Sequence, residues 1–149
     1  MANVNYDIRK GVLDKLLTGT TSFKTAISKT VGATTFYRLY YSEVPQVYQG
    51  TSTAATPPWV AFSILPIIPE RDSATKWYQF TLQFNVSALT QTDCDSLAGY
   101  LTDLMEDSEA SLTIGTYQTV SVLRAPQVNL PKVDNVYNIA VQYSVIIQK

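Results

Sequence analysis

Histidine is absent from this chain of 149 residues, and cysteine occurs once. The side chain that most often performs general acid–base catalysis is therefore missing, and a single cysteine allows neither an internal disulfide nor a paired-cysteine metal motif. Asp93 and Asp95 are two residues apart on a predicted helix, so they face different directions and form a poor metal pair. The sequence also has no glycine-rich phosphate loop. We expect no enzymatic activity, no metal and no cofactor.

Charged residues are also scarce, at 15% of the chain with a net charge of −1. Globular proteins usually carry about 25%, and a surface so poor in charge is often partly covered by a partner. The few charges are unevenly spread. Basic residues dominate the first forty positions, whereas the stretch from Trp77 to Arg124 contains acids and no Lys or Arg before its last residue. Two oppositely charged surface helices explain this distribution, and head-to-tail matching between copies in a ring is the alternative.

Long apolar runs are missing as well. No segment approaches the ~20 apolar residues that a membrane-spanning helix requires, and charges at Arg9, Lys10, Asp14 and Lys15 interrupt any signal-peptide-like start. We therefore expect no membrane partner and a cytoplasmic site of synthesis. A hydrophobic content of 46% argues against disorder and favours one folded domain over residues 1–149.

The clearest pattern present is strand alternation. Residues 78–86 alternate large apolar with uncharged polar side chains, and residues 136–147 repeat the pattern. Successive strand side chains point to opposite faces, so each segment should bury one face and present another that is polar but uncharged. Such a face is unusual on a surface that meets only water.

Helical periodicity indicates two further elements. Ile8, Val12 and Leu16 predict an amphipathic helix from Asn5, as N-cap, to Leu17. A second helix over 90–106 should bury Cys94, Leu97, Leu101, Leu104 and Met105, with Thr90 and Asp93 as a capping pair, Gly99 close to the sheet and fraying near Asp107.

The remaining segments are less periodic. We expect strands over 36–41 and 59–65, and a hairpin arm or short strand pair over 112–123 kinked at Gly115. We also expect an irregular crossing over 20–35, with a turn of helix around residues 23–28, and turns over 66–75. Residues 42–58 should form a mobile loop. The predicted fold is α+β, an antiparallel sheet of about four or five strands with two helices on one face. Its ten tyrosines and two tryptophans favour core and interface packing over nucleic-acid stacking, because no basic groove accompanies them.

Over nearly its full length the chain resembles the tail terminator, or tail completion, family of long-tailed bacteriophages. The resemblance lies in the N-terminal helix, the extended segment ending at Glu43-Val44-Pro45, and the variable polar loop that follows. It continues in Pro58–Ile64 (PWVAFSI), the strand through Phe80–Val86 (FTLQFNV), the next helix and the long last strand. The Thr-rich segment Thr18–Thr35 departs from the simplest members of the family.

The resemblance implies a subunit of a homo-oligomeric, hexameric ring that caps the tail tube and presents a surface to the head-completion or connector protein. It also implies that DNA passes through the lumen without specific binding. The protein would belong to the head-proximal end of the virion tail, after assembly in the host cytoplasm. The residues alone leave open a tail-tube or connector subunit, or a ligand-binding domain with an apolar pocket between Phe80, Phe84 and Leu101.

If the chain is such a ring subunit, the uncharged strand faces and the loop 42–58 should supply the contacts with other subunits and with the tail tube. The candidate contact residues are Tyr48, Gln49, Trp59, Arg71, Gln79, Gln83, Asn85, Asn138 and Gln142.

Overall fold

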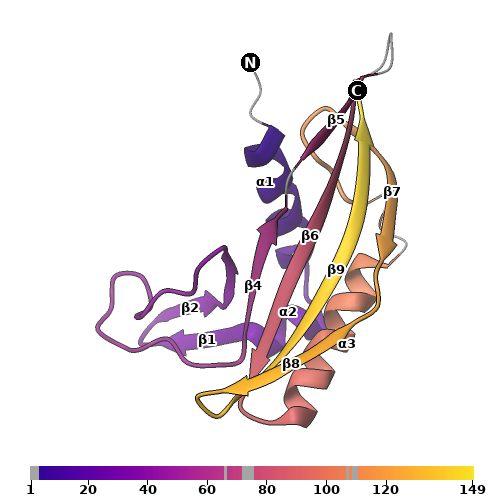
Figure 1. The fold of residues 1–149 in the computed structure, drawn as a ribbon. Helices are drawn as coiled ribbons and strands as arrows, with labels where there is room; N and C mark the ends of the chain where they lie inside the picture. The colour runs from indigo at the N-terminus through magenta and orange to yellow at the C-terminus, as the bar shows by residue number, and fades with distance from the viewer. Residues whose placement is uncertain (1–3, 66, 72–75, 107, 109–110) are drawn as a thin grey trace.

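The computed structural model describes residues 4–65, 67–71, 76–106, 108 and 111–149, which form three helices and nine strands (Figure 1). The helices are α1 (Val4–Leu17), α2 (Ser22–Ile27) and α3 (Gln91–Met105). The strands are β1 (Ser28–Val31), β2 (Thr34–Tyr37), β3 (Leu39–Tyr41), β4 (Trp59–Ile64), β5 (Ile68–Arg71), β6 (Lys76–Ala88), β7 (Gln118–Arg124), β8 (Val128–Val133) and β9 (Val136–Gln148).

Seven of the strands form one sheet. Its main path is β3-β4-β6-β9-β7, β5 pairs with β6, and β8 pairs with β9. All these pairs are antiparallel except β3 with β4, which is parallel. The α+β class is thus confirmed, with one parallel pair, more strands than expected and a third helix. Strands β1 and β2 form a separate two-stranded sheet.

Strands β6 and β9 form the centre of the molecule. They pair without interruption from Trp77 opposite Gln148 to Ala88 opposite Tyr137, and each has 13 residues, a length of about 44 Å. The predicted alternation is confirmed. Phe80, Leu82, Phe84 and Val86 are buried, Tyr78 is partly buried, and β9 adds the buried Ile139, Val141, Tyr143, Val145 and Ile147. Burying each large apolar side chain contributes about 1.5–3 kcal/mol.

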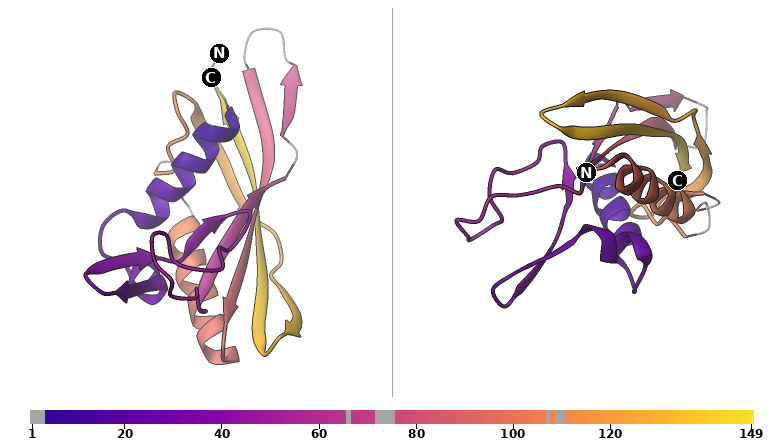
Figure 2. Two further views of the ribbon diagram at one scale, coloured as in Figure 1. Left: turned by 90° about the vertical axis from the view of Figure 1, so that its left-hand side faces the viewer. Right: turned by 90° about the horizontal axis from the view of Figure 1, so that it is seen from below.

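The helices cover one face of this sheet. Figure 2 (left) shows α1 over one end and α3 over the other, both on the same side. At 1.5 Å per residue each helix is only about 20–23 Å long, so two are needed to cover strands of this length. Ile8, Val12 and Leu16 of α1 are fully buried, as are Cys94, Leu101 and Met105 of α3.

The helix ends agree in part with the sequence predictions. Thr90 caps α3, because its side-chain oxygen accepts a hydrogen bond from the Asp93 backbone N–H at 3.1 Å, and the helix ends at Met105 as expected. Asn5 is not an N-cap, since α1 already begins at Val4. Gly99 does not approach the sheet, because it is exposed with no neighbouring atom within 4 Å of a Cβ built there.

The close approach occurs instead at Gly11 of α1. A Cβ at Gly11 would lie inside van der Waals contact with the Thr113 carbonyl oxygen and 3.2 Å from Ile114 Cγ1. Gly11 is buried, so α1 packs directly against the backbone of the segment that precedes β7. Glycine is therefore the residue that fits at position 11, because a side chain would collide with this backbone.

Two predictions near the N-terminus need correction. The crossing over 20–35 contains the expected helical turn, α2, but also the strand β1, which was not predicted, and the predicted strand over 36–41 is divided at Arg38. Its first part, β2, pairs with β1, and its second part, β3, joins the main sheet. Residues 42–58 contain no helix or strand, as predicted, but they are joined by a bridge between Val47 and Ala54.

The other differences between the predicted and the observed elements also involve short strands. The predicted turn region 66–75 contains β5, whereas residues 66 and 72–75 lie outside the described residues. The predicted strand pair over 112–123 is β7 with a bridge between Ile114 and Tyr117, which flank Gly115 at φ 53°. Strand β8 was not predicted. It joins β9 through Asp134 and Asn135, which both have positive φ, as a tight hairpin turn requires.

No helix among the described residues is both long and apolar enough to cross a membrane. No three His, Cys, Asp or Glu side chains in the same residues are grouped closely enough to hold a metal ion.

Candidate assembly surface

On the face of the sheet opposite the helices, the positions of β4, β6 and β9 carry no charge and are partly buried, with Ser87 and Ala140 buried. We call this face the outer face and define it by the strand positions that alternate with the buried ones. Figure 2 (left) shows that no helix lies over it. From β4, β6 and β9 it comprises Trp59, Ala61, Ser63, Trp77, Gln79, Thr81, Gln83, Asn85, Ser87, Val136, Asn138, Ala140, Gln142, Ser144, Ile146 and Gln148, none of them ionisable.

Amide side chains on the outer face bind one another across the strands. Gln142 Nε2 donates to Gln83 Oε1 at 2.9 Å, and Gln83 Nε2 donates to Asn85 Oδ1 at 3.3 Å. Nearer the end of the sheet, the Ser87 hydroxyl donates to Asn138 Oδ1 at 2.6 Å. Each amide has further donor and acceptor capacity, so the outer face is an ordered polar surface that can bind another backbone or amide.

Most of the predicted contact residues share this surface. Gln79, Gln83 and Asn85 on β6, Asn138 and Gln142 on β9, and Trp59 on β4 all lie on the outer face and are partly buried.

Three predicted contact residues lie elsewhere. Gln49 is exposed in the loop 42–58, and Arg71 ends β5, opposite Lys76. Tyr48 is 1% exposed, stacks on Phe36 with ring centroids 5.3 Å apart, and has its hydroxyl 3.3 Å from Thr56 Oγ1. Its side chain therefore stabilises the loop internally and is not an open contact surface.

An apolar margin continues the outer face and was missed in the sequence. Leu123 on β7 lies opposite Ser144, and Val128 and Leu130 on β8 lie opposite Ala140 and Asn138. These three side chains are large, and Leu123 is 64% exposed. Exposed apolar residues next to a charge-free polar face are typical of a surface that a partner covers. The alternation of apolar and polar residues within 121–130 is too short to have indicated this apolar margin in the sequence.

A second feature is a projecting hairpin of residues 28–37, which we call the arm. It consists of β1 and β2 and extends away from the body in Figures 1 and 2. Arg38, at its base, is 6% exposed and donates to three carbonyl oxygens: Nε to Ile27 at 3.0 Å, one terminal nitrogen to Thr56 at 3.0 Å and the other to Ser28 at 2.9 Å. The guanidinium thus joins α2, β1 and the end of the loop 42–58.

Of the two oppositely charged helices expected from the sequence, only α3 carries charges of a single sign. On α3 the carboxylates of Asp93, Asp95 and Asp103 are exposed. Glu106, at the C-cap, forms an ion pair of 3.1 Å with Arg124 of β7. Asp107 and Glu109 lie outside the described residues.

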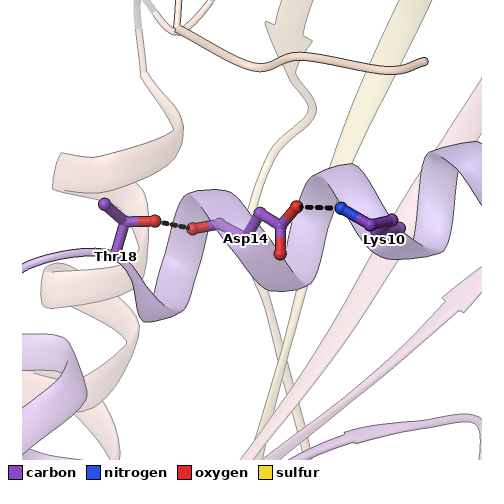
Figure 3. A network of polar contacts seen from close by, with 3 residues as sticks. All are labelled: Lys10, Asp14 and Thr18. Atoms are coloured by element: carbon purple, nitrogen blue, oxygen red, sulfur yellow. Dashed lines mark hydrogen bonds and ion pairs between the residues drawn. The ribbon is translucent and has the colours of Figure 1, made fainter.

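On α1, positive and negative side chains are interspersed. Lys10 Nζ lies 2.8 Å from Asp14 Oδ2, and the Thr18 hydroxyl donates to the Asp14 backbone carbonyl, as Figure 3 shows. Lys15 Nζ donates to Ser111 Oγ at 2.8 Å across a groove of about 830 Å³ between α1 and residues 111–115. The cations in this groove are therefore already bound to neighbours of the same chain.

The described side chains offer little reactive chemistry. Cys94 is fully buried, and its thiol lies 3.4 Å from the Val86 carbonyl oxygen. Burial, assisted by the nearby Asp95 charge, raises the pKa of Cys94 to about 11, which disfavours the nucleophilic thiolate. Phe80, Phe84 and Leu101, the residues of the alternative apolar pocket, are all buried members of one hydrophobic core cluster.

Comparison with known proteins gives a fold relationship. No protein-family model and no curated protein sequence matches the chain. A solved structure described as the virion of a native gene transfer agent particle contains a chain that matches with a TM-score of 0.74. The match covers 100% of both chains at 11% sequence identity. At that identity the likeness establishes a shared fold over the full length.

Proposed function

We propose that this chain is a structural virion protein that forms a ring at the head-proximal end of a phage tail, closes the tail tube and provides the interface to the head connector. The supporting observation is a broad, charge-free sheet face without helices, on a fold shared over its full length with a component of a virion particle.

The physical argument concerns what such a face can contact. Cores of protein interfaces are depleted of Lys, Glu and Asp, and wet interfaces tolerate amides whose remaining hydrogen bonds a partner completes. Copies of this chain, the tail-tube protein and the head-completion protein are the proposed partners. A lumen without basic side chains would let DNA pass, because phosphate contacts from Lys and Arg would hold it.

The proposal is tested by placing charge on the outer face. Gln83→Lys and Asn85→Lys put an ammonium where the partner would have to desolvate it, so ring formation should be lost while the urea unfolding midpoint stays within the range of surface variants. Thr116→Lys, at an exposed turn away from the outer face, is the matched control. Rings are counted by negative-stain electron microscopy, and mass is measured by sedimentation on the same sample.

Normal rings from both outer-face variants would contradict the proposal. Open filaments from the wild-type protein would instead indicate a tail-tube subunit, because a head-to-tail contact that does not close continues indefinitely. Native mass spectrometry of the same preparation detects any bound small molecule, which is what a ligand-binding domain would show.

A further inference from the structure

The arm has no support from the rest of its own chain beyond its base. None of residues 28–37 is buried, and β1 and β2 form a sheet that is not joined to the main one. An isolated two-stranded hairpin is marginally stable in water. A projecting hairpin of this kind is stabilised when another surface covers it.

Its base is nevertheless held firmly. The Arg38 guanidinium is hydrogen-bonded to three carbonyl oxygens, and its backbone N–H donates to Ile27 O at 2.9 Å. Phe36, at the end of the arm nearest the body, stacks on the buried Tyr48. These contacts fix the direction in which the arm leaves the body, which pre-organises it for a contact in a defined place.

The arm region is positively charged. Between residues 16 and 42 the ionisable acids and bases are Lys24, Lys29 and Arg38, with no Asp or Glu. Arg38 is buried at the base, so Lys24 and Lys29 carry the outward charge. Lys24 Nζ lies 4.9 Å from the centre of the Tyr37 ring, which places this charge beside the arm.

The exposed side of α3 has the opposite charge. Asp95, Gly99 and Asp103 follow one another at intervals of four residues and are all exposed, so they form one stripe along the helix. Gly99 has no side chain and no atom within 4 Å of a Cβ built there, which leaves the helix backbone open to close approach in the middle of the stripe. Tyr100 beside it is 38% exposed.

We infer that the arm of one subunit lies against the acidic stripe of α3 in a neighbouring copy of the same chain. The arm and α3 lie at the same end of the molecule but on opposite sides of it (Figure 1). A contact between two different surfaces of identical subunits is head-to-tail, the type that closes into rings. This inference rests on the proposed ring, and it adds a second contact between its subunits to the one proposed for the outer face.

The test reverses each charged surface separately. The arm variant carries Lys24→Glu and Lys29→Glu, and the helix variant carries Asp95→Lys and Asp103→Lys. Each variant alone meets like charges at every contact, so its association should weaken by about tenfold or more, measured by sedimentation at low ionic strength. Raising the salt concentration should weaken wild-type association as well. Lys149→Glu, at the opposite end of the sheet, is the control for a changed net charge.

Complementation makes the result specific. An equal mixture of the arm and helix variants restores opposite charges at every contact if the two alternate around the ring. A single chain carrying all four substitutions restores them too. Both preparations should form rings, and unfolding in urea verifies that each variant remains folded as a monomer.

The outcomes separate the two ideas. If wild-type protein and both reversed variants form rings equally well, or if complementation fails although every variant is folded, the arm contact is wrong and the ring proposal stands. If the wild-type protein stays monomeric at all concentrations and in the presence of tail tubes, the ring proposal and the arm contact are both overturned.

Discussion

Replacing Gly11 by alanine tests the packing of α1 most directly. This glycine is in the middle of the helix, and its Cα faces the backbone of Thr113. Glycine in a helix interior is less favourable than alanine by about 0.8–1.0 kcal/mol. On helix propensity alone, Gly11→Ala should therefore stabilise the protein.

The atoms around Gly11 reverse this expectation, so the substitution should lower the stability of the protein. The new methyl group would overlap with the Thr113 carbonyl oxygen and come within 3.2 Å of Ile114 Cγ1. The nearest obstacle is backbone, so α1 or residues 111–115 must move. Overpacking that forces backbone to shift usually costs about 1–3 kcal/mol. Subtracting the propensity gain of about 1 kcal/mol leaves an expected net loss of up to about 2 kcal/mol.

Gly99→Ala is the matched control, since the same substitution in α3 adds a methyl group to open space. It should stabilise the monomer by about 0.5–1 kcal/mol. Urea unfolding followed by far-ultraviolet circular dichroism measures both variants against wild type. If Gly11→Ala matches or exceeds the stability of Gly99→Ala, the close packing of α1 against residue 113 is refuted.

Two further predictions concern buried polar groups. Arg38→Lys should destabilise the protein by about 2 kcal/mol or more and speed amide exchange in residues 28–37, because an ammonium cannot reach three separate carbonyls. Burial raises the pKa of Cys94 from 9.0 to about 11, so the stabilisation of its neutral thiol is complete below pH 9 and is lost as the pH rises from 9 to 11. In Cys94→Ala the fall in stability over that interval should be smaller, and a thiol reagent at pH 8 should react with wild type only on unfolding.

The long elements could be predicted because their periodicity is visible over three or more repeats. Strands β6 and β9 alternate over 13 residues each, and α1 and α3 repeat apolar residues at intervals of three and four. In these elements the side chains that face the core are determined by the local pattern. The α+β class followed from their order.

The short edge strands could not be predicted in the same way. Strand β5 has four residues and contains Pro69, and β8 has six and contains Pro131. Proline normally argues against a strand, yet it is tolerated at an edge, where its missing N–H faces away from the ladder. Which strands lie at an edge depends on the complete sheet.

The candidate surface could be predicted from the sequence only in part, for the same reason. Alternation in the sequence indicated the polar positions of β6 and β9, whereas the apolar margin around Leu123 and Val128 depends on which strands pair with β9. Arg38 is one of the basic residues of the first forty positions, and nothing in the sequence marks it as buried. Its burial requires the carbonyl groups of Ile27 and Ser28 and that of the distant Thr56, which no local pattern reveals.

The position of β9 has a consequence for the time course of folding. Strands β6, β7 and β8 all pair with it, yet its partners in β6 precede it by 49 residues at the near end, Ala88 to Tyr137, and 71 at the far end, Trp77 to Gln148. A nascent chain cannot close these ladders until β9 has left the ribosome, so the earlier apolar strands wait without their central partner. Folding should be slow, because such distant pairings must lose loop entropy before they gain contacts. Until then, the half-made sheet is the stage at which the chain is most open to aggregation.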